Sequence, residues 1–118
     1  MSPPPLKVAI AGLGTVGGGV AQILHTHRAL LAQRCGRAIQ LVAVADQRPF
    51  DKLATQLDAH GKGSVVLYND AMKMANDSGA DVIVETIGGY KVALDVARLA
   101  LQVLILLARS RCLSKHHT

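Results

Sequence analysis

The chain has 118 residues, of which half are apolar and 18% are charged, and its formal net charge is +5. This length supports one domain with one hydrophobic core, and the apolar share argues against a disordered chain. Only 3% of the residues are aromatic, so few rings are present on which the bases of a single-stranded nucleic acid could stack.

The positive charge is concentrated at one end. Three of the 13 basic residues and none of the 8 acidic ones lie in residues 109–118, which we interpret as a solvated basic tail. Nucleic acid is therefore not expected as a partner. Binding through the tail is the weakest functional alternative, and it would be steeply salt-dependent.

The chain begins with Met-Ser-Pro-Pro-Pro-Leu-Lys, which lacks the basic and then apolar layout of a secretory signal. Its prolines predict an extended arm over residues 1–6. The longest apolar run, residues 99–108, is about half as long as a membrane span. Cys35 and Cys112 give neither a metal-binding spacing nor a disulfide framework. We expect a cytoplasmic protein with no membrane segment and no metal site.

Residues 6–11 are apolar and are bounded by prolines and glycines, which predicts a strand buried on both faces. Apolar residues then recur at helical spacing from Thr15 to about Gln33, and Gly36 supplies a stop, so we expect one long helix there. Residues 38–46 are predicted to form a second buried strand, which ends in an acidic residue.

Helices and strands continue to alternate in the rest of the chain. The pattern predicts a short helix within 48–63, a strand over 64–70, a helix over 71–77, a strand over 80–89 and a helix over 90–102. Strands separated by helices need crossover connections, and right-handed crossovers generate a doubly wound parallel sheet. The expected fold class is α/β, a Rossmann-type doubly wound parallel sheet in a single domain.

A glycine-rich turn follows the first strand. Gly12, Gly14 and Gly17 form the pattern G-x-G-x-x-G at the start of the first helix. The first glycine permits a tight turn, the second lets the backbone approach a pyrophosphate, and the third lets the helix pack closely on the strand. The free amides and the dipole of the helix N-terminus would face the phosphates. The motif predicts a dinucleotide site; a purely structural turn is the alternative.

Two charged residues at the end of the second strand bear on the choice of cofactor. Asp46 could accept hydrogen bonds from the 2′-hydroxyl of a ribose, which favours NAD, whereas Arg48 could pair with the 2′-phosphate of NADP. The two signals oppose each other, so the cofactor is expected to be NADP or NAD. A solvated strand-end acid and a loop cation are the structural alternatives.

The fourth strand ends in Gly88 and Gly89, at the edge of the sheet where the glycine turn is expected. Ligands of open parallel sheets lie at this carboxyl edge, so the segment could line the nicotinamide side of the groove. We interpret Glu85 as a buried or partly buried strand residue with a structural partner, and not as a catalytic carboxylate.

Three segments, LKVAIAGLGTVGGGVAQIL, LVAVAD and ADVIVETIGG, together resemble the N-terminal cofactor-binding domain of homoserine dehydrogenase. The likeness covers about residues 6–102. That family uses NAD or NADP to interconvert L-homoserine and aspartate semialdehyde, in the biosynthesis of threonine, methionine and isoleucine. The resemblance implies a dinucleotide-binding domain over residues 7–108.

The resemblance also implies roles for individual residues. It places the pyrophosphate on Gly12, Leu13, Gly14, Thr15, Val16 and Gly17, the adenosine ribose at Asp46 or Arg48, and the nicotinamide beside Thr86, Ile87, Gly88 and Gly89.

The resemblance ends after residue 102. The family continues with the motif T-A-N-K-(A/P)-L, whose lysine is tied to hydride transfer, and then with a substrate and dimerisation domain. This chain instead reads VLILLARSRCLSKHHT. We therefore assign no catalytic residue, and expect an incomplete fold and an inactive chain. A homo-oligomer is expected only of the full-length family enzyme.

Two interpretations of residues 103–118 remain open. Codons for Asn-Lys-Pro-Leu read one position later can encode Thr-Ser-Arg-Cys, and Ser110, Arg111 and Cys112 stand in that place, as a shifted reading frame would give. The alternative is a genuine fifth strand over 103–108. In a different functional class, the chain could be a free-standing nucleotide-binding or regulatory module, which would associate with a partner in a cofactor-dependent way.

Overall fold

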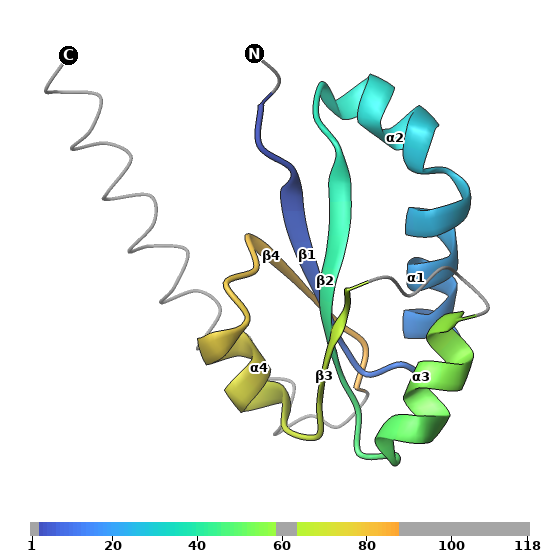
Figure 1. Cartoon of the computed structure of the whole chain (residues 1–118), viewed down its shortest axis with the longest axis vertical. Coiled ribbons are helices and arrows are strands. Elements are labelled where there is room, and N and C mark those ends of the chain that lie inside the picture. Colours follow the sequence, from blue (N-terminus) through green and yellow to red (C-terminus); the bar gives the residue numbers. More distant parts are fainter. Residues whose placement is uncertain (1–2, 59–63, 88–118) are drawn as a thin grey trace, which may run out of the picture.

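The computed structural model describes residues 3–58 and 64–87. Strands and helices alternate along these residues (Figure 1). The elements are β1 (Leu6–Ala11), α1 (Thr15–Thr26), α2 (Arg28–Cys35), β2 (Ile39–Ala45), α3 (Phe50–Asp58), β3 (Val66–Tyr68), α4 (Ala71–Asp77) and β4 (Val82–Glu85).

The four strands form one sheet in the order β3-β2-β1-β4, and every neighbouring pair is parallel. The chain moves outward from β1 through β2 to β3 and then crosses back, so that β4 pairs with the other side of β1. The predicted α/β fold with a doubly wound parallel sheet is therefore confirmed. The carboxyl ends of the strands lie at the lower end of the sheet in Figure 1.

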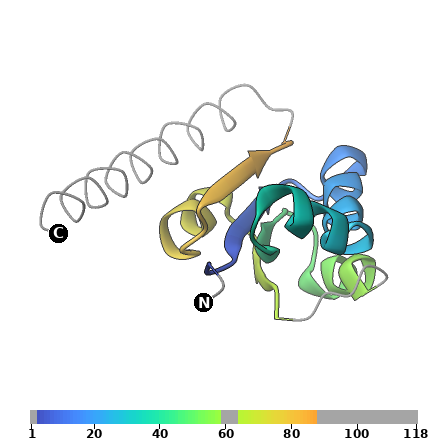
Figure 2. The ribbon, with the colours of Figure 1, turned by 90° about the horizontal axis from the view of Figure 1, so that it is seen from above.

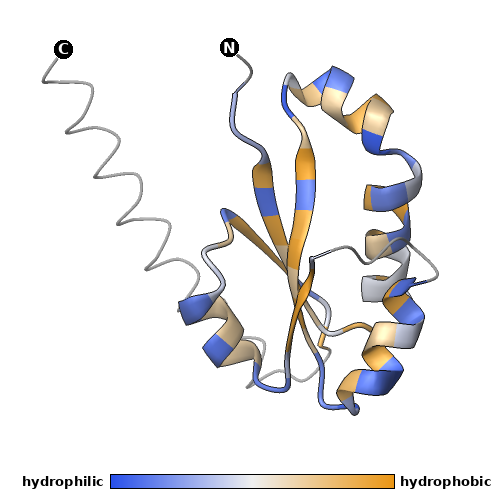
Figure 3. Cartoon of the chain, viewed as in Figure 1, coloured by the Kyte–Doolittle hydropathy of each residue, from blue (hydrophilic) through white to orange (hydrophobic). Residues whose placement is uncertain are grey.

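Helices cover both faces of this sheet (Figure 2). On one face, Ile10 and Val44 pack with residues of α1 and α3, among which Leu53 and Leu57 are almost completely buried. On the opposite face the strands present alanines, and Met74 of α4 packs against them. The two inner strands are apolar along most of their length, as Figure 3 shows, because both of their faces are covered.

The single long helix expected between the first two strands is wrong. His27 interrupts it with φ −106° and ψ 24°, and α1 and α2 lie on either side of this residue. The side chain of Arg28 donates to the carbonyl oxygen of His25 at 2.8 Å, which provides a partner for a carbonyl near the end of α1. The stop at Gly36 is confirmed, because this residue caps α2 in the left-handed conformation with φ 75°.

The remaining boundaries agree in part. The helix predicted over 71–77 is confirmed, and it begins at Asp70, whose carboxylate accepts from the amide of Met72 at 2.9 Å. Strands β3 and β4 are shorter than predicted. The helix predicted over 90–102, the strand over 103–108 and the basic tail over 109–118 lie outside the described residues. Within the described part, no helix is long and apolar enough to cross a membrane.

Candidate functional site

The turn after β1 approaches the end of β4 so closely that one of its residues has no room for a side chain. Gly12 has φ +97°, and a Cβ added to it would lie 3.0 Å from the carbonyl carbon and oxygen of Thr86. Few residues other than glycine adopt this conformation. The tight turn predicted at Gly12 is therefore present, and the loop after β4 leans on it.

Gly17 brings α1 against the same turn. A Cβ at this position would run into the carbonyl oxygen of Gly12 and would lie 2.8 Å from Oγ1 of Thr86. That hydroxyl donates to the carbonyl oxygen of Gly12 at 2.6 Å. The close packing predicted for Gly17 is thus observed, and Thr86 joins the ends of β1 and β4.

Among the described residues, nothing covers the N-terminus of α1. Gly14 is its N-cap, no side chain of the described part caps the helix, and its first turn carries no acidic residue. Apart from its chain neighbours, no described atom lies within 4 Å of a Cβ placed on Gly14, and Val16 is 67% exposed. Amides and the positive end of a helix dipole therefore face space that an anion such as a pyrophosphate fits.

Asp46 follows β2 and binds the glycine turn. Its Oδ2 accepts from the amide of Leu13 at 2.8 Å, and its Oδ1 accepts from the amide of Arg48 at 2.9 Å. Burial alone would raise the pKa of Asp46, but these two amides and the Arg48 guanidinium outweigh burial and lower the pKa below its ordinary value. Asp46 is consequently a carboxylate at neutral pH.

Arg48 is also held by the protein. Its Nε lies 3.2 Å from Oδ1 of Asp46, and its Nη2 donates to the carbonyl oxygen of Leu13 at 2.6 Å and to Oε1 of Gln56 at 2.9 Å. The guanidinium is therefore part of the support of the turn, and Arg48 is a loop cation with protein partners whose side chain is 46% exposed.

The end of β4 is described only as far as Ile87. The amide of Ile87 donates to Oε1 of Glu85 at 2.5 Å, so the predicted structural partner of Glu85 exists. The predicted burial is wrong, because Glu85 is exposed on a strand with no neighbour on its outer side among the described strands. Gly88 and Gly89 lie outside the described residues.

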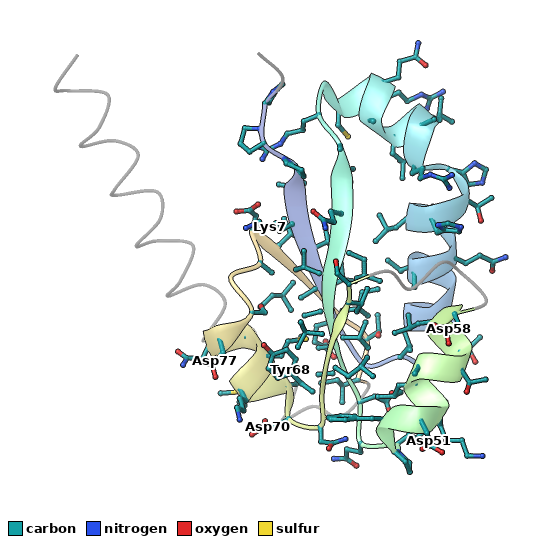
Figure 4. The ribbon with its side chains drawn as sticks, viewed as in Figure 1. Lys7, Asp51, Asp58, Tyr68, Asp70 and Asp77 are labelled. Carbon is teal, nitrogen blue, oxygen red and sulfur yellow. The ribbon has the colours of Figure 1, made fainter. Side chains whose placement is uncertain are left out.

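A cavity of about 520 Å³ lies beside Asp46 at the carboxyl ends of the strands. Asn69, Asp70, Met72 and Ile87 also line it. Figure 4 shows Asp70 at this end of the molecule and Lys7 toward the opposite end. Since ligands of open parallel sheets occupy the carboxyl edge, we assign this cavity to the site.

A larger cavity, of about 620 Å³, lies toward the amino ends of β2 and β3. Leu24, Ile39 and Leu41 are among the residues that line it. No residue of the Gly12–Gly17 turn borders either cavity. The larger one lies away from the carboxyl edge, whereas Asp46, which binds the turn, lines the smaller one, so size alone does not identify the site.

Two polar residues of the site were not predicted from the sequence. Gln56 donates to the carbonyl oxygen of Leu13 at 3.2 Å, and the side-chain amide of Asn69 donates to the carbonyl oxygens of Asp46 and Arg48, each at 3.3 Å. Asn69 lies near the carboxyl end of the strand predicted over 64–70, and this position was a usable signal. Nothing in the sequence distinguished Gln56 from an ordinary polar residue of an amphipathic helix.

Known proteins are similar to this chain in sequence. A family model described as the NAD-binding domain of homoserine dehydrogenase matches residues 12–105. The homoserine dehydrogenase of Methylobacillus glycogenes is 36% identical over 98 residues, which make up 83% of this chain and 23% of that protein. The homoserine dehydrogenase of Pseudomonas aeruginosa is 37% identical over 98 residues, which make up 83% of this chain and 21% of that protein.

Solved structures agree. The crystal structure of a homoserine dehydrogenase from Thiobacillus denitrificans matches with a TM-score of 0.73 and 29% identity over 86% of this chain and 22% of that one. The homoserine dehydrogenase of S. aureus matches with a TM-score of 0.64 and 28% identity over 85% of this chain and 24% of that one. The chain spans less than a quarter of the length of these relatives. It belongs to the homoserine dehydrogenase family of oxidoreductases, and the part that matches is the NAD-binding domain.

Proposed function

We propose that this chain holds NAD or NADP at the carboxyl edge of its sheet and provides the cofactor site for the reaction of its family. In that reaction L-homoserine and NAD(P)+ are converted to aspartate semialdehyde and NAD(P)H. The pathway that follows from it is the biosynthesis of threonine, methionine and isoleucine, and the compartment that suits it is the cytoplasm. The observation that carries the proposal is the open N-terminus of α1 at Gly14.

The pyrophosphate would lie on the turn formed by Gly12, Leu13, Gly14, Thr15, Val16 and Gly17. Support comes from the exposed start of α1, where, its chain neighbours aside, no atom of residues 3–58 and 64–87 lies within 4 Å of a Cβ placed on Gly14. The amides there donate hydrogen bonds and the helix dipole favours a negative charge. The side chain of Leu13 is fully buried. Its backbone supports the turn, because its amide donates to Asp46 and its carbonyl oxygen accepts from Arg48.

The adenosine ribose would lie at Asp46, with Arg48 beside it. Asp46 borders the cavity at the carboxyl edge, and its side chain keeps 15% of its surface exposed. An ionised carboxylate there accepts hydrogen bonds from ribose hydroxyls. The cavity between Asp46 and Ile87 has a mixed lining that suits the adenine ring.

The nicotinamide would lie beside the segment from Thr86 to Gly89. Support comes from the described half of this segment, since Thr86 contacts the turn that would carry the pyrophosphate. When bound, the nicotinamide ring supplies hydride chemistry. The residues of this chain bind and orient the cofactor, and we assign none of them a catalytic role. We propose that these residues belong to a dinucleotide-binding domain that covers residues 7–108.

The test is a pair of glycine substitutions on one helix. Gly14→Ala places a methyl group where the pyrophosphate would lie, without a clash in the free protein, whereas Gly19→Ala adds a methyl group in open space outside the turn. We expect Gly14→Ala to raise the dissociation constants for NADH and NADPH at least about tenfold, because close backbone contact with the pyrophosphate is lost. Gly19→Ala should leave both dissociation constants unchanged in isothermal titration calorimetry.

Two results would contradict the proposal. The first is that the folded chain binds neither dinucleotide, and the second is that Gly14→Ala binds both as tightly as the parent chain. Homoserine oxidation is measured separately. Binding without turnover does not separate the proposal from the nucleotide-binding or regulatory module, because the chain is expected to be inactive in both; cofactor-dependent association with a partner would favour the module.

A further inference from the structure

We propose that Gln56 is a positioning residue that holds the guanidinium of Arg48 against the glycine turn and thereby favours NAD over NADP. This inference rests on the cofactor site proposed above and concerns its selectivity. It follows from the donors that Arg48 has already committed to the protein, and from the contact that keeps Gln56 in place.

The guanidinium of Arg48 uses most of its donors internally. Its Nε donates to Asp46 at 3.2 Å, and its Nη2 donates to the carbonyl oxygen of Leu13 at 2.6 Å and to Oε1 of Gln56 at 2.9 Å. An arginine carries five N–H groups, and it binds a phosphate best through two parallel ones. Any pair of parallel N–H groups that includes Nη2 therefore contains a donor that already binds Leu13 or Gln56.

Among the residues that the structure describes, Nη1 is the only nitrogen of the Arg48 guanidinium without a protein acceptor. Arg48 therefore presents a positive charge, but it has no free pair of parallel N–H donors for a phosphate. A ribose 2′-hydroxyl needs only the carboxylate of Asp46, whereas a 2′-phosphate would meet the negative charge of that carboxylate and an arginine that is bound elsewhere. This arrangement favours NAD.

Gln56 reaches its partners through space that Gly18 leaves free. Its Nε2 donates to the carbonyl oxygen of Leu13 at 3.2 Å, so the amide group spans Leu13 and Arg48. A Cβ on Gly18 would lie 2.7 Å from this Nε2. A side chain at position 18 would therefore displace the end of Gln56 from this place, although the dinucleotide motif itself ends at Gly17.

The experiment compares NADPH with NADH in four variants of the full chain. Gln56→Ala removes the acceptor. Gly18→Ala displaces the acceptor by contact from α1, while Gln56 and Arg48 themselves remain unsubstituted. Gln56→Glu keeps an oxygen for Arg48 and tests rescue, and Gly19→Ala is the matched helix control. The readout is the ratio of the dissociation constants for NADPH and NADH from calorimetry, with thermal unfolding as the check on folding.

We expect the parent chain to bind NADH more tightly than NADPH. Gln56→Ala and Gly18→Ala should each shift the ratio toward NADPH by about tenfold, the usual size of one hydrogen bond to a charged group. Gly19→Ala should keep the parent ratio, and Gln56→Glu should not shift it toward NADPH, because it keeps an acceptor for Arg48 and adds a negative charge that disfavours a 2′-phosphate. A general loosening of the turn would weaken the binding of both cofactors together and leave the ratio of their dissociation constants unchanged. The ratio therefore separates positioning from a purely structural effect.

The outcomes distinguish this inference from the proposed function. If the folded parent chain binds neither dinucleotide, the proposed function fails. If it binds them but folded Gln56→Ala keeps the parent ratio, or if the parent prefers NADPH, the inference about Gln56 is overturned. Should Gly18→Ala unfold, Gln56→Ala and Gln56→Glu still decide the question.

Discussion

Gly17 and Gly19 lie two residues apart on α1, yet a methyl group added at each would meet different surroundings. At Gly17 it would overlap the carbonyl oxygen of Gly12, and at Gly19 no atom lies within 4 Å. We expect Gly17→Ala to destabilise the fold by about 3 kcal/mol or more, because backbone atoms must move apart. Gly19→Ala should stabilise it by up to about 1 kcal/mol through helix propensity.

Urea unfolding followed by circular dichroism measures both changes. Equal stability of the two variants would show that the helix does not pack on the turn as described. The contrast isolates the contact, because both substitutions make the same chemical change on one helix.

Asp46 gives a prediction in pH. Its pKa is lower in the folded chain than its ordinary value, so its contribution to stability is complete above the unfolded pKa of about 3.9 and is lost as pH falls through the folded pKa. Asp46→Asn removes this contribution and one acceptor for the amides of Leu13 and Arg48. We expect a loss of about 1–2 kcal/mol at pH 7.

The difference between Asp46→Asn and the parent chain should shrink as the pH is lowered below about 4, because the parent carboxylate is then protonated as well. Urea unfolding of both proteins at a series of pH values measures this. A gap that stays constant down to the acid limit, or that widens there, would contradict the assignment. Asp58→Asn on the exposed surface of α3 is the matched control.

At the scale of the elements, periodicity and punctuation predicted all four described strands and placed α3 and α4. The strand before Gly12 and the acid after β2 were enough to bring the turn, Asp46 and Thr86 to one edge, because parallel strands share the direction of their ends. The break at His27 could not be predicted, since the apolar spacing continues on both sides of it. The hydrogen bond that the Arg48 guanidinium donates to Gln56 depends on the packing between α1 and α3.

Thr86 tests the connection between elements. Its hydroxyl donates to the carbonyl oxygens of Gly12 at 2.6 Å and of Ala11 at 3.1 Å, and thus links the ends of β1 and β4. Thr86→Val keeps the shape and removes the donor, which should cost about 1–2 kcal/mol by leaving a part-buried carbonyl without this partner.

The control for Thr86 is Thr55→Val, which removes a hydroxyl that donates to the carbonyl oxygen of Asp51 within α3, away from the buried face of that helix. We expect its effect on unfolding to be within about 0.5 kcal/mol. If Thr86→Val were as mild as Thr55→Val, the hydroxyl bridge would not hold the two strand ends together.

At the scale of the whole molecule, the proposed cofactor site draws on residues that are far apart in the sequence. The turn after β1, Asp46 after β2 and Thr86 after β4 meet at one edge only in the folded sheet. A dinucleotide that bridges them binds the native chain and not the unfolded one. Binding and stability are therefore linked by mass action.

This linkage predicts that NADH at about one hundred times its dissociation constant raises the free energy of unfolding by about 2.7 kcal/mol. Urea titration at increasing NADH concentrations measures the gain, which should grow with the logarithm of ligand concentration. Gly14→Ala, whose binding is expected to be at least tenfold weaker, should reduce the gain to about 1.4 kcal/mol or less at the same NADH concentrations, since the methyl group blocks the pyrophosphate but leaves the free fold intact. An equal gain in the two proteins would place the cofactor somewhere other than the N-terminus of α1.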